Sequence, residues 1–376
     1  MERRHTAILL AAVLALAAAV GCGKHVSVKN GHPAELWRFG YMDKMGRVVI
    51  PPRFAEANSF KEGLASVGAA KGGWQYIDRT GRVVIGNDHA DRHPFSEGLA
   101  QVTNVNDRRF SYVDKKGCPV FHSQYKDTGA FSGGLTPFWS GGYSAAGDHV
   151  GYGYIDKTGK VVVRPRFSYA DDFSEGLAAV GVVYSGRGKY GYIDKHGNWT
   201  VRPRFDNGNR FSEGLAAAWV GKAVGFVDKK GMWVIRPRYQ DAGDFSEGLA
   251  AVQVADNWGY IDKTGKMTIS PQPFITGEPF SDGRARIEMP SIRSGFIDKT
   301  GRVVIKPRFE AAMSFREGLA LVAVDEKHWG YIDTTGKMVI AKPPSPFSAM
   351  DYRDSGQEDR WSFSEGLAPV EVRVAH

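Results

Sequence analysis

Short stretches of alternating apolar and polar residues recur along the chain, and they predict β-strands. In residues 248–254 the alternation places Ala250, Val252 and Val254 on one face of a strand. Residues 258–262 are aromatic and β-branched, which favours a second strand, and residues 266–270 predict a third. No sustained helical period occurs in this unit, so each unit is expected to be all β.

Turn residues separate these predicted strands. Asp262-Lys263-Thr264-Gly265 predicts a hairpin, because the Asp side chain can accept bonds from nearby N–H groups and Gly adopts the left-handed conformation that such a turn requires. The Pro-Arg-Phe sequence at residues 307–309 is expected to end the third strand of its unit, since proline has no N–H to donate. Three strands joined by hairpins form an antiparallel meander.

This unit recurs about nine times. Copies of the phrase Phe-Ser-Glu-Gly-Leu-Ala, some of them degenerate, alternate with the aromatic strand and are mostly 34 to 38 residues apart. They begin at Phe60, Phe95, Phe131, Phe173, Phe211, Phe245, Phe280, Phe315 and Phe363. A fixed period of this length indicates a repeat architecture.

The route of the chain between units limits the possible folds. A three-stranded meander ends at the edge opposite to its start, so residues 308–315 must cross the unit as a fourth strand or an extended segment. Four strands per repeated unit are typical of β-propeller blades, and the small residues at 214–218 suit a crowded inner strand.

The two ends of the array favour closure. The first strand, residues 37–41, is of the aromatic type that stands second in a unit, and the last, residues 366–372, is of the type that stands first. One unit is thus divided between the ends. We therefore expect an all-β tandem repeat array of antiparallel β-meanders that closes into a propeller-like ring; the alternative is an open β-solenoid whose end strands are caps.

The aromatic phrase, clearest as Trp258-Gly259-Tyr260-Ile261-Asp262, resembles the WG (KWG) repeat family of bacterial proteins over residues 36–376. Other residues replace the namesake tryptophan at Phe39, Phe110, Tyr152, Tyr190, Val224 and Ser294. The resemblance implies a β-rich repeat domain and no general enzymatic activity.

The first residues predict export. Arginines precede an apolar run from Ala7 to Val20, which is short for a membrane span and typical of a signal peptide. The Gly21-Cys22 that follows resembles the lipobox of bacterial lipoproteins, which implies cleavage before Cys22, lipid on that residue and a membrane anchor in the cell envelope. An uncleaved anchor and an ordinary signal peptide are the alternatives. We expect residues 1–21 to be the signal, 22–35 a linker and 36–376 the repeat array.

The formal net charge is +8, but the basic residues are spread through Asp-Lys turns and Pro-Arg steps such as Lys157 and Arg166. This distribution is typical of a solvated surface, and no nucleic-acid partner is expected. The chain contains two cysteines, Cys22 and Cys118. With Cys22 acylated, Cys118 is expected to be a free thiol.

No enzyme is expected from the motifs. The glutamate of the Ser-Glu-Gly phrase recurs in nearly every repeat unit. A protein needs its active site only once, so a residue repeated in this way is better explained by a structural role. We found no phosphate-binding loop and no Ser-His or Cys-His nucleophile pattern. We therefore expect no cofactor and no metal.

Departures from the repeat give the candidate binding residues. The connection between the first and second strands is long in two consecutive units, and both connections are expected at the same edge of the array. Insertions on one face of a repeat array often form the binding face, although surface loops also tolerate insertions. The candidates are Trp139, Tyr143, His149, Tyr184 and Arg187.

The sequence thus favours a non-catalytic envelope lipoprotein whose array is a binding or scaffolding module for a protein or an envelope glycan. The alternatives are a purely structural or assembly role and, least favoured, an envelope enzyme.

Overall fold

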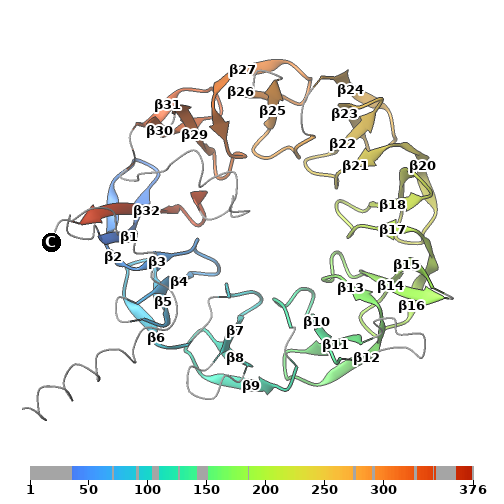
Figure 1. Cartoon of the computed structure of the whole chain (residues 1–376), viewed down its shortest axis with the longest axis horizontal. Coiled ribbons are helices and arrows are strands. Elements are labelled where there is room, and N and C mark those ends of the chain that lie inside the picture. Colours follow the sequence, from blue (N-terminus) through green and yellow to red (C-terminus); the bar gives the residue numbers. More distant parts are fainter. Residues whose placement is uncertain are drawn as a thin grey trace, which may run out of the picture. The chain divides into compact units, whose positions relative to one another are not determined.

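The described residues form nine small antiparallel sheets arranged in a ring, a nine-bladed β-propeller (Figure 1). The computed structural model describes residues 36–69, 72–89, 93–103, 110–125, 128–141, 151–184, 186–273, 277–289, 293–325, 328–341, 343 and 361–374. The ring is the compact unit Trp37–Val372. A second unit, Met1–Leu36 with Arg373–His376, lies almost entirely outside the described residues.

We number the sheets as blades 1 to 9 along the chain. Blade 1 contains β32 (Leu367–Val374), β1 (Leu36–Asp43) and β2 (Val48–Phe54); blade 2 contains β3 (Glu56–Ala57), β4 (Leu64–Gly68), β5 (Trp74–Asp78) and β6 (Val83–His89); blade 3 contains β7 (Leu99–Thr103), β8 (Phe110–Asp114) and β9 (Pro119–Ser123); blade 4 contains β10 (Leu135–Trp139), β11 (Tyr152–Asp156) and β12 (Val161–Phe167). Blade 5 contains β13 (Tyr169–Ala170), β14 (Ala178–Tyr184), β15 (Arg187–Ile193) and β16 (Trp199–Phe205); blade 6 contains β17 (Asn207–Gly208), β18 (Ala216–Val220), β19 (Ala223–Val227) and β20 (Trp233–Tyr239). Blade 7 contains β21 (Asp241–Ala242), β22 (Leu249–Val254), β23 (Asn257–Asp262) and β24 (Met267–Gln272); blade 8 contains β25 (Ala285–Met289), β26 (Arg293–Ile297) and β27 (Val303–Phe309); blade 9 contains β28 (Ala311–Ala312), β29 (Leu319–Asp325), β30 (His328–Asp333) and β31 (Met338–Ala341).

In blades 2, 5, 6, 7 and 9 the crossing segment becomes a two-residue strand on the inner side of its blade. In blade 5 the order is β13-β14-β15-β16, with Tyr169 opposite Gly181 and Ala170 opposite Val180. Both forms expected for this segment therefore occur together, a very short fourth strand within an extended crossing. The small-residue strand lies one position further out than expected.

Strand β22, the second strand of blade 7, is buried on both faces along most of its length. In β22 the residues Leu249, Ala250, Ala251 and Val252 are all buried, although they alternate in direction. Blades that stand face to face cover both sides of each strand, which explains why simple alternation fails here. Val254, expected on the buried face with Ala250 and Val252, is 37% exposed because β22 ends there.

The expectation that proline ends the third strand was wrong. Strand β27 continues through Pro307 to Phe309, which lies opposite Ser294 on β26. The third strand is the outermost strand of its blade, so it has one edge without a neighbouring strand. A proline on such an edge costs no ladder hydrogen bond.

The hairpin turns have the predicted chemistry. The Asp262 carboxylate accepts hydrogen bonds from the backbone N–H of Thr264 (2.9 Å) and of Lys266 (3.0 Å), and from the Thr264 hydroxyl (2.6 Å). Gly265 has a φ of 83°, in the left-handed region. The turn is therefore fixed locally by its own sequence.

The ring closes through the last strand. β32 pairs beside β1, so blade 1 is built from both ends of the array. Next to this sheet, the Ser364 hydroxyl donates to the Phe60 carbonyl (2.7 Å), and the Glu365 carboxylate accepts from Gly63 N–H (2.9 Å). These contacts confirm the closed ring and exclude the open solenoid.

The nine turns that carry the Phe-Ser-Glu-Gly phrase or a degenerate copy of it contact one another from blade to blade, and we call them the turn belt. Glu213 illustrates it: its carboxylate accepts from Gly248 N–H of the next turn (3.0 Å) and pairs with Lys263 (3.0 Å). Partial burial raises the pKa of Glu213, but these two partners more than offset it, so the pKa lies below its ordinary value. Lys263, from an Asp-Lys turn, is therefore half exposed to solvent and also forms an ion pair with the preceding blade.

Candidate functional site

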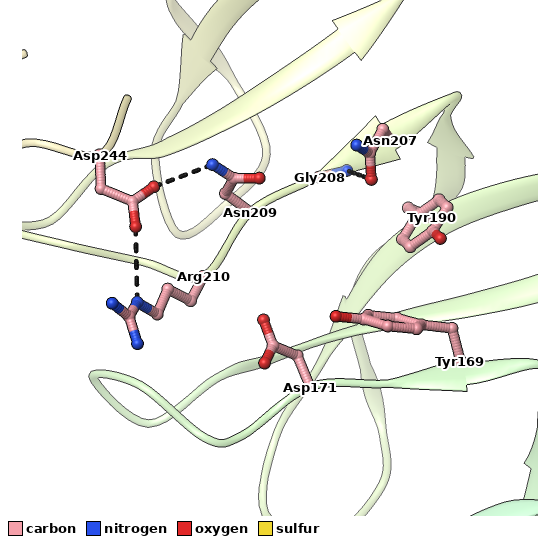
Figure 2. Close-up of a pocket in the computed structure, with 8 residues that line it drawn as sticks. All are labelled: Tyr169, Asp171, Tyr190, Asn207, Gly208, Asn209, Arg210 and Asp244. Atoms are coloured by element: carbon pink, nitrogen blue, oxygen red, sulfur yellow. Dashed lines mark hydrogen bonds and ion pairs between the residues drawn. The ribbon is translucent and has the colours of Figure 1, made fainter. Parts of the chain in front are cut away.

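An open pocket of about 370 Å³ lies along the inner strands of blades 5 and 6, β13 and β17 (Figure 2). Figure 1 places these two strands on the inner side of the ring. The pocket is lined by Tyr169, Asp171, Tyr190, Asn207, Gly208, Asn209, Arg210 and Asp244.

Two tyrosines form the aromatic wall. The rings of Tyr169 and Tyr190 lie 5.5 Å apart and tilted, and Tyr169 is 42% exposed. Tyr190 stands at the namesake position of its repeat, opposite Phe205 in the ladder with β16, and the chain then turns inward to Asn207. The repeat geometry itself therefore brings this aromatic position to the inner strand of the next blade.

The aromatic surface extends into blade 4. The ring of Trp139, the last residue of β10, lies 4.9 Å from that of Tyr152 on β11. Tyr152 lies opposite Phe167, two residues before Tyr169. We call Trp139, Tyr152, Tyr169 and Tyr190 the aromatic row.

Planar polar side chains form the opposite wall. Figure 2 shows the Asp244 carboxylate between Asn209, whose amide donates to it at 3.0 Å, and Arg210, whose Nε lies 3.4 Å away. The Asn207 side-chain oxygen accepts from Gly208 N–H at 2.9 Å. Within the described part of the chain, the Tyr169 and Tyr190 hydroxyls and the Asn207 amide nitrogen make no hydrogen bond, so a ligand can use them.

Buried tyrosines hold the backbone of this pocket in place. The Tyr154 hydroxyl donates to the Asp171 carbonyl (2.7 Å) and the Tyr192 hydroxyl to the Asn209 carbonyl (2.8 Å). Burial and neighbouring carboxylates raise the pKa of both tyrosines above the ordinary value, so both remain donors. A site held by buried hydrogen bonds is pre-organised for binding.

The surroundings of the pocket favour the neutral form of the Tyr169 hydroxyl. Burial raises the pKa of Tyr169, and the nearby Asp171 carboxylate raises it further. In Figure 2 the Tyr169 hydroxyl points toward Asp171. The pKa of Asp172 is also raised, first by desolvation and then by the charge of Asp171, while Arg210 acts in the opposite direction.

The structure places three of the predicted binding residues. Trp139 lies in the aromatic row and is half buried. Tyr184 pairs with Arg187 in the backbone ladder of β14 and β15, at the tip of that hairpin in the next blade, and Arg187 is exposed. The hairpins of blades 4 and 5 occupy corresponding places in their blades. Tyr143 and His149, like Cys22, lie outside the described residues.

Sequence reasoning missed the pocket itself. Tyr169, Asp171, Asn209 and Arg210 are in a crossing segment that reads as a connection. A signal was present at Tyr169, because the corresponding first residue of the inner strand is Glu56, Asp241 or Ala311 in other blades. Tyr190 was noted as a replacement of the namesake tryptophan, but the sequence did not predict which residues of the next blade lie beside it.

The described residues contain no group of three His, Cys, Asp or Glu side chains suited to a metal ion. They also include no helix long and apolar enough to cross a membrane. Cys118 is an exposed free thiol in a hairpin turn.

Comparison with known proteins identifies the repeats. The sequence matches the family described as "WG containing repeat" over residues 39–68, 152–182, 190–220, 225–258, 258–289, 295–327 and 329–342, more than half of the chain. The chain belongs to this family. All eight lining residues of the pocket fall within three consecutive matched WG repeats, those of residues 152–182, 190–220 and 225–258. A WG repeat propeller of this kind indicates a binding or scaffolding module.

No curated protein matches the sequence. Among solved structures, BamB from Moraxella catarrhalis is 15% identical and aligns with 65% of this chain and 80% of its own, with a TM-score of 0.35. Hsv2 from Kluyveromyces lactis is 11% identical and aligns with 76% of this chain and 99% of its own, also with a TM-score of 0.35. Likenesses this distant carry no argument about the function of the WG repeat propeller.

Proposed function

We propose that this protein is a non-catalytic binding module and that the pocket with its aromatic row binds an envelope glycan. The observation that carries the proposal is the pairing of a partly exposed tyrosine wall with planar polar side chains across an open pocket. A protein partner and a purely structural role are the competing possibilities, and the experiment below separates them.

The chemistry of a sugar ring suits this arrangement. One face of a pyranose carries C–H groups, which pack favourably on the electron-rich face of an aromatic ring. Its edge carries hydroxyls, each both donor and acceptor, which suit Asn, Asp and Arg side chains. Tyr169 and Tyr190 supply the aromatic faces, and Asn207, Asp171 and Arg210 supply the polar groups.

The shape of the aromatic row supports a chain rather than a single sugar. It extends from Trp139 in blade 4 to Tyr190 in blade 5, while the pocket continues through blade 6 to Asp244 in blade 7. Successive aromatic platforms of this kind fit successive units of a polymer. Two χ angles per aromatic residue keep the ordering entropy on binding low.

Titration of the protein with solubilised peptidoglycan fragments and neutral oligosaccharides, followed by calorimetry, tests the proposal. We expect Tyr169→Ala to weaken binding by about tenfold, corresponding to about 1.4 kcal/mol. Glu56→Ala is the matched control, since Glu56 is the corresponding inner-strand residue of blade 2 and lies outside the pocket. Unchanged thermal unfolding of both variants excludes misfolding as the cause.

The double variant Trp139→Ala and Tyr184→Ala tests the two hairpins on the same scaffold. Aromatic side chains are the usual binding anchors, so we expect a further loss of affinity without unfolding. If Tyr169→Ala weakens binding and this double variant does not, the hairpins are only tolerated insertions. Saturable binding of a protein with no binding of any glycan would refute the glycan proposal.

We also propose that the protein is exported and anchored to a membrane of the bacterial cell envelope through lipid on Cys22. The support is the sequence: basic residues, an apolar run of signal-peptide length and a cysteine at the expected cleavage site. Several acyl chains on one residue would give a stable anchor.

Metabolic labelling with a palmitate analogue, followed by membrane fractionation, tests the anchor. We expect Cys22→Ser to abolish labelling and to release the protein from membranes. The Cys118→Ser variant is the control and should remain labelled. Labelling that persists in Cys22→Ser would show that this cysteine carries no lipid.

A further inference from the structure

The turn belt is regular at eight of its nine blade interfaces. At each of these, an acidic side chain in one turn accepts a hydrogen bond from the N–H of the last glycine of the next turn. The pairs are Glu62–Gly98, Glu97–Gly134, Glu175–Gly214, Glu213–Gly248, Glu247–Gly283, Asp282–Gly318, Glu317–Gly366 and Glu365–Gly63. At six of them a lysine from the neighbouring blade pairs with the same carboxylate: Lys44, Lys115, Lys157, Lys229, Lys263 and Lys299.

The ninth interface, between blades 4 and 5, keeps every part of this arrangement except the carboxylate. Gly133 stands where the other turns have Glu or Asp. The Ser132 hydroxyl still donates to the Phe173 carbonyl (2.5 Å), as its counterparts do. Gly133 has a φ of 63°, close to the 53° of Glu213, so the turn has the same backbone conformation.

Two groups correspond to those that bind the carboxylate at the other interfaces. Lys195 extends toward Gly133, and its Nζ lies 3.3 Å from the point where a Cβ on that residue would stand. The partner N–H belongs to Gly176. Among the described residues, neither the Lys195 ammonium nor the Gly176 N–H has a hydrogen-bond or ion-pair partner. Lys195 therefore reaches a position that a carboxylate fills at the other eight interfaces, and Gly176 is the equivalent of the glycines whose N–H donates to that carboxylate.

We propose that this interface is a carboxylate-binding site that takes a glutamate side chain from an acidic segment of a partner protein. The ammonium of Lys195 supplies the charge, and the Gly176 N–H fixes the orientation of one carboxylate oxygen. A glutamate fits because the chain itself places one in the same setting at other turns, as Glu213 shows with Lys263 and Gly248.

The site is open to an external ligand. The side chains of the paired acidic residues are about one-third exposed, for example 32% at Glu97 and 29% at Glu213, so the corresponding position faces solvent. A single exposed ion pair contributes little free energy. The carboxylate is therefore best supplied by a larger ligand that makes further contacts, which favours an acidic protein segment over a free small acid.

Nuclear magnetic resonance of the isotope-labelled protein tests the proposal with the Gly176 amide as reporter. The probe is a capped peptide containing three glutamates, and the control probe has glutamine in their place. We expect a saturable downfield shift of the Gly176 amide proton with the glutamate peptide alone. The Gly214 amide, already bonded to Glu175, is the internal control and should not move.

Two variants identify the groups involved. We expect Gly133→Glu to abolish the response, because the introduced side chain fills the site, and to raise the temperature of unfolding. We expect Lys195→Met to weaken the peptide affinity about threefold, as the loss of one exposed ion pair implies, while the fold is retained. Tyr169→Ala should leave the response intact, which separates this site from the proposed glycan pocket.

Several results would overturn the proposal. These are an unmoved Gly176 amide, an equal response to the glutamine peptide, or unchanged peptide binding by Gly133→Glu. Tighter binding of uronate oligosaccharides than of the peptide, at equal charge, would show that the ligand class is wrong. N-acetylglutamate amide, used alone, should bind more weakly than the peptide; equal affinity would show that only a free carboxylate is recognised.

Discussion

Deletion of residues 363–376 is expected to open the ring and to remove hydrogen-exchange protection from the amides around Tyr41. The deletion removes β32, which pairs beside β1, together with the Ser364 and Glu365 contacts to the turn of blade 2. It also removes the buried side chains of Phe363, Leu367 and Val370. Loss of one buried aromatic side chain alone typically costs about 3–5 kcal/mol, so we expect a loss of at least about 4 kcal/mol in the free energy of unfolding.

Denaturant unfolding gives that free energy, and hydrogen exchange shows where protection is lost. The amides around Tyr192, in blade 5, are the internal control. They should lose less protection than those around Tyr41, because the cut is remote from them in the ring. Full protection around Tyr41 in the truncated protein would contradict closure through β32.

The ring was predictable because the repeat is legible in the sequence. Each unit carries the same turn and strand phrases, and the first and last strands belong to different positions in the unit. This arrangement favoured one blade shared by both ends over an open solenoid with capping strands, and the pairing of β1 with β32 confirms it. The turn chemistry of Asp262 and Gly265 was likewise readable, because it depends on neighbours within four residues.

Features that depend on contact between blades were not readable. Ala251 and Val252 are both buried because a blade packs on each side of β22. The pattern of residues within one strand does not show that two blades flank it. The basic side chain of Arg238 looks like part of a solvated surface, yet it donates to the Gly265 carbonyl of the next blade at 2.8 Å. Repeated residues of this kind contact the next blade, so their partners lie about one repeat further along the sequence.

The candidate site also combines residues that the sequence predicted with residues that only contact between blades brings together. Trp139, Tyr184 and Arg187 were selected because their hairpins depart from the repeat, and the structure places Trp139 in the aromatic row. The pocket remained hidden because Tyr190 and Asn207 come from different strands of consecutive blades. Only the ring geometry brings them together.

Replacing Gly191 by alanine is expected to destabilise the propeller by about 3 kcal/mol or more, whereas Gly188→Ala should be nearly neutral. Both glycines lie on β15, three residues apart, so strand propensity and sequence context are matched. A Cβ on Gly191 would lie 2.5 Å from the Val201 carbonyl oxygen and 2.8 Å from the Pro203 nitrogen, both backbone atoms of β16. A Cβ on Gly188 would meet no atom within 4 Å.

The size of the effect follows from what must move. Side chains can rotate away from an added methyl group, but β16 is held in register by Tyr190 opposite Phe205 and Tyr192 opposite Val201. Overpacking in a well-packed interior typically costs about 1–3 kcal/mol, and a clash with fixed backbone lies at or above the upper end of that range. The same close approach occurs at Gly225, where a Cβ would lie 2.3 Å from the Ile235 carbonyl oxygen, so Gly225→Ala should reproduce the loss. Equal unfolding free energies for Gly191→Ala and Gly188→Ala would show that the glycine of the WG phrase is not required by this backbone contact.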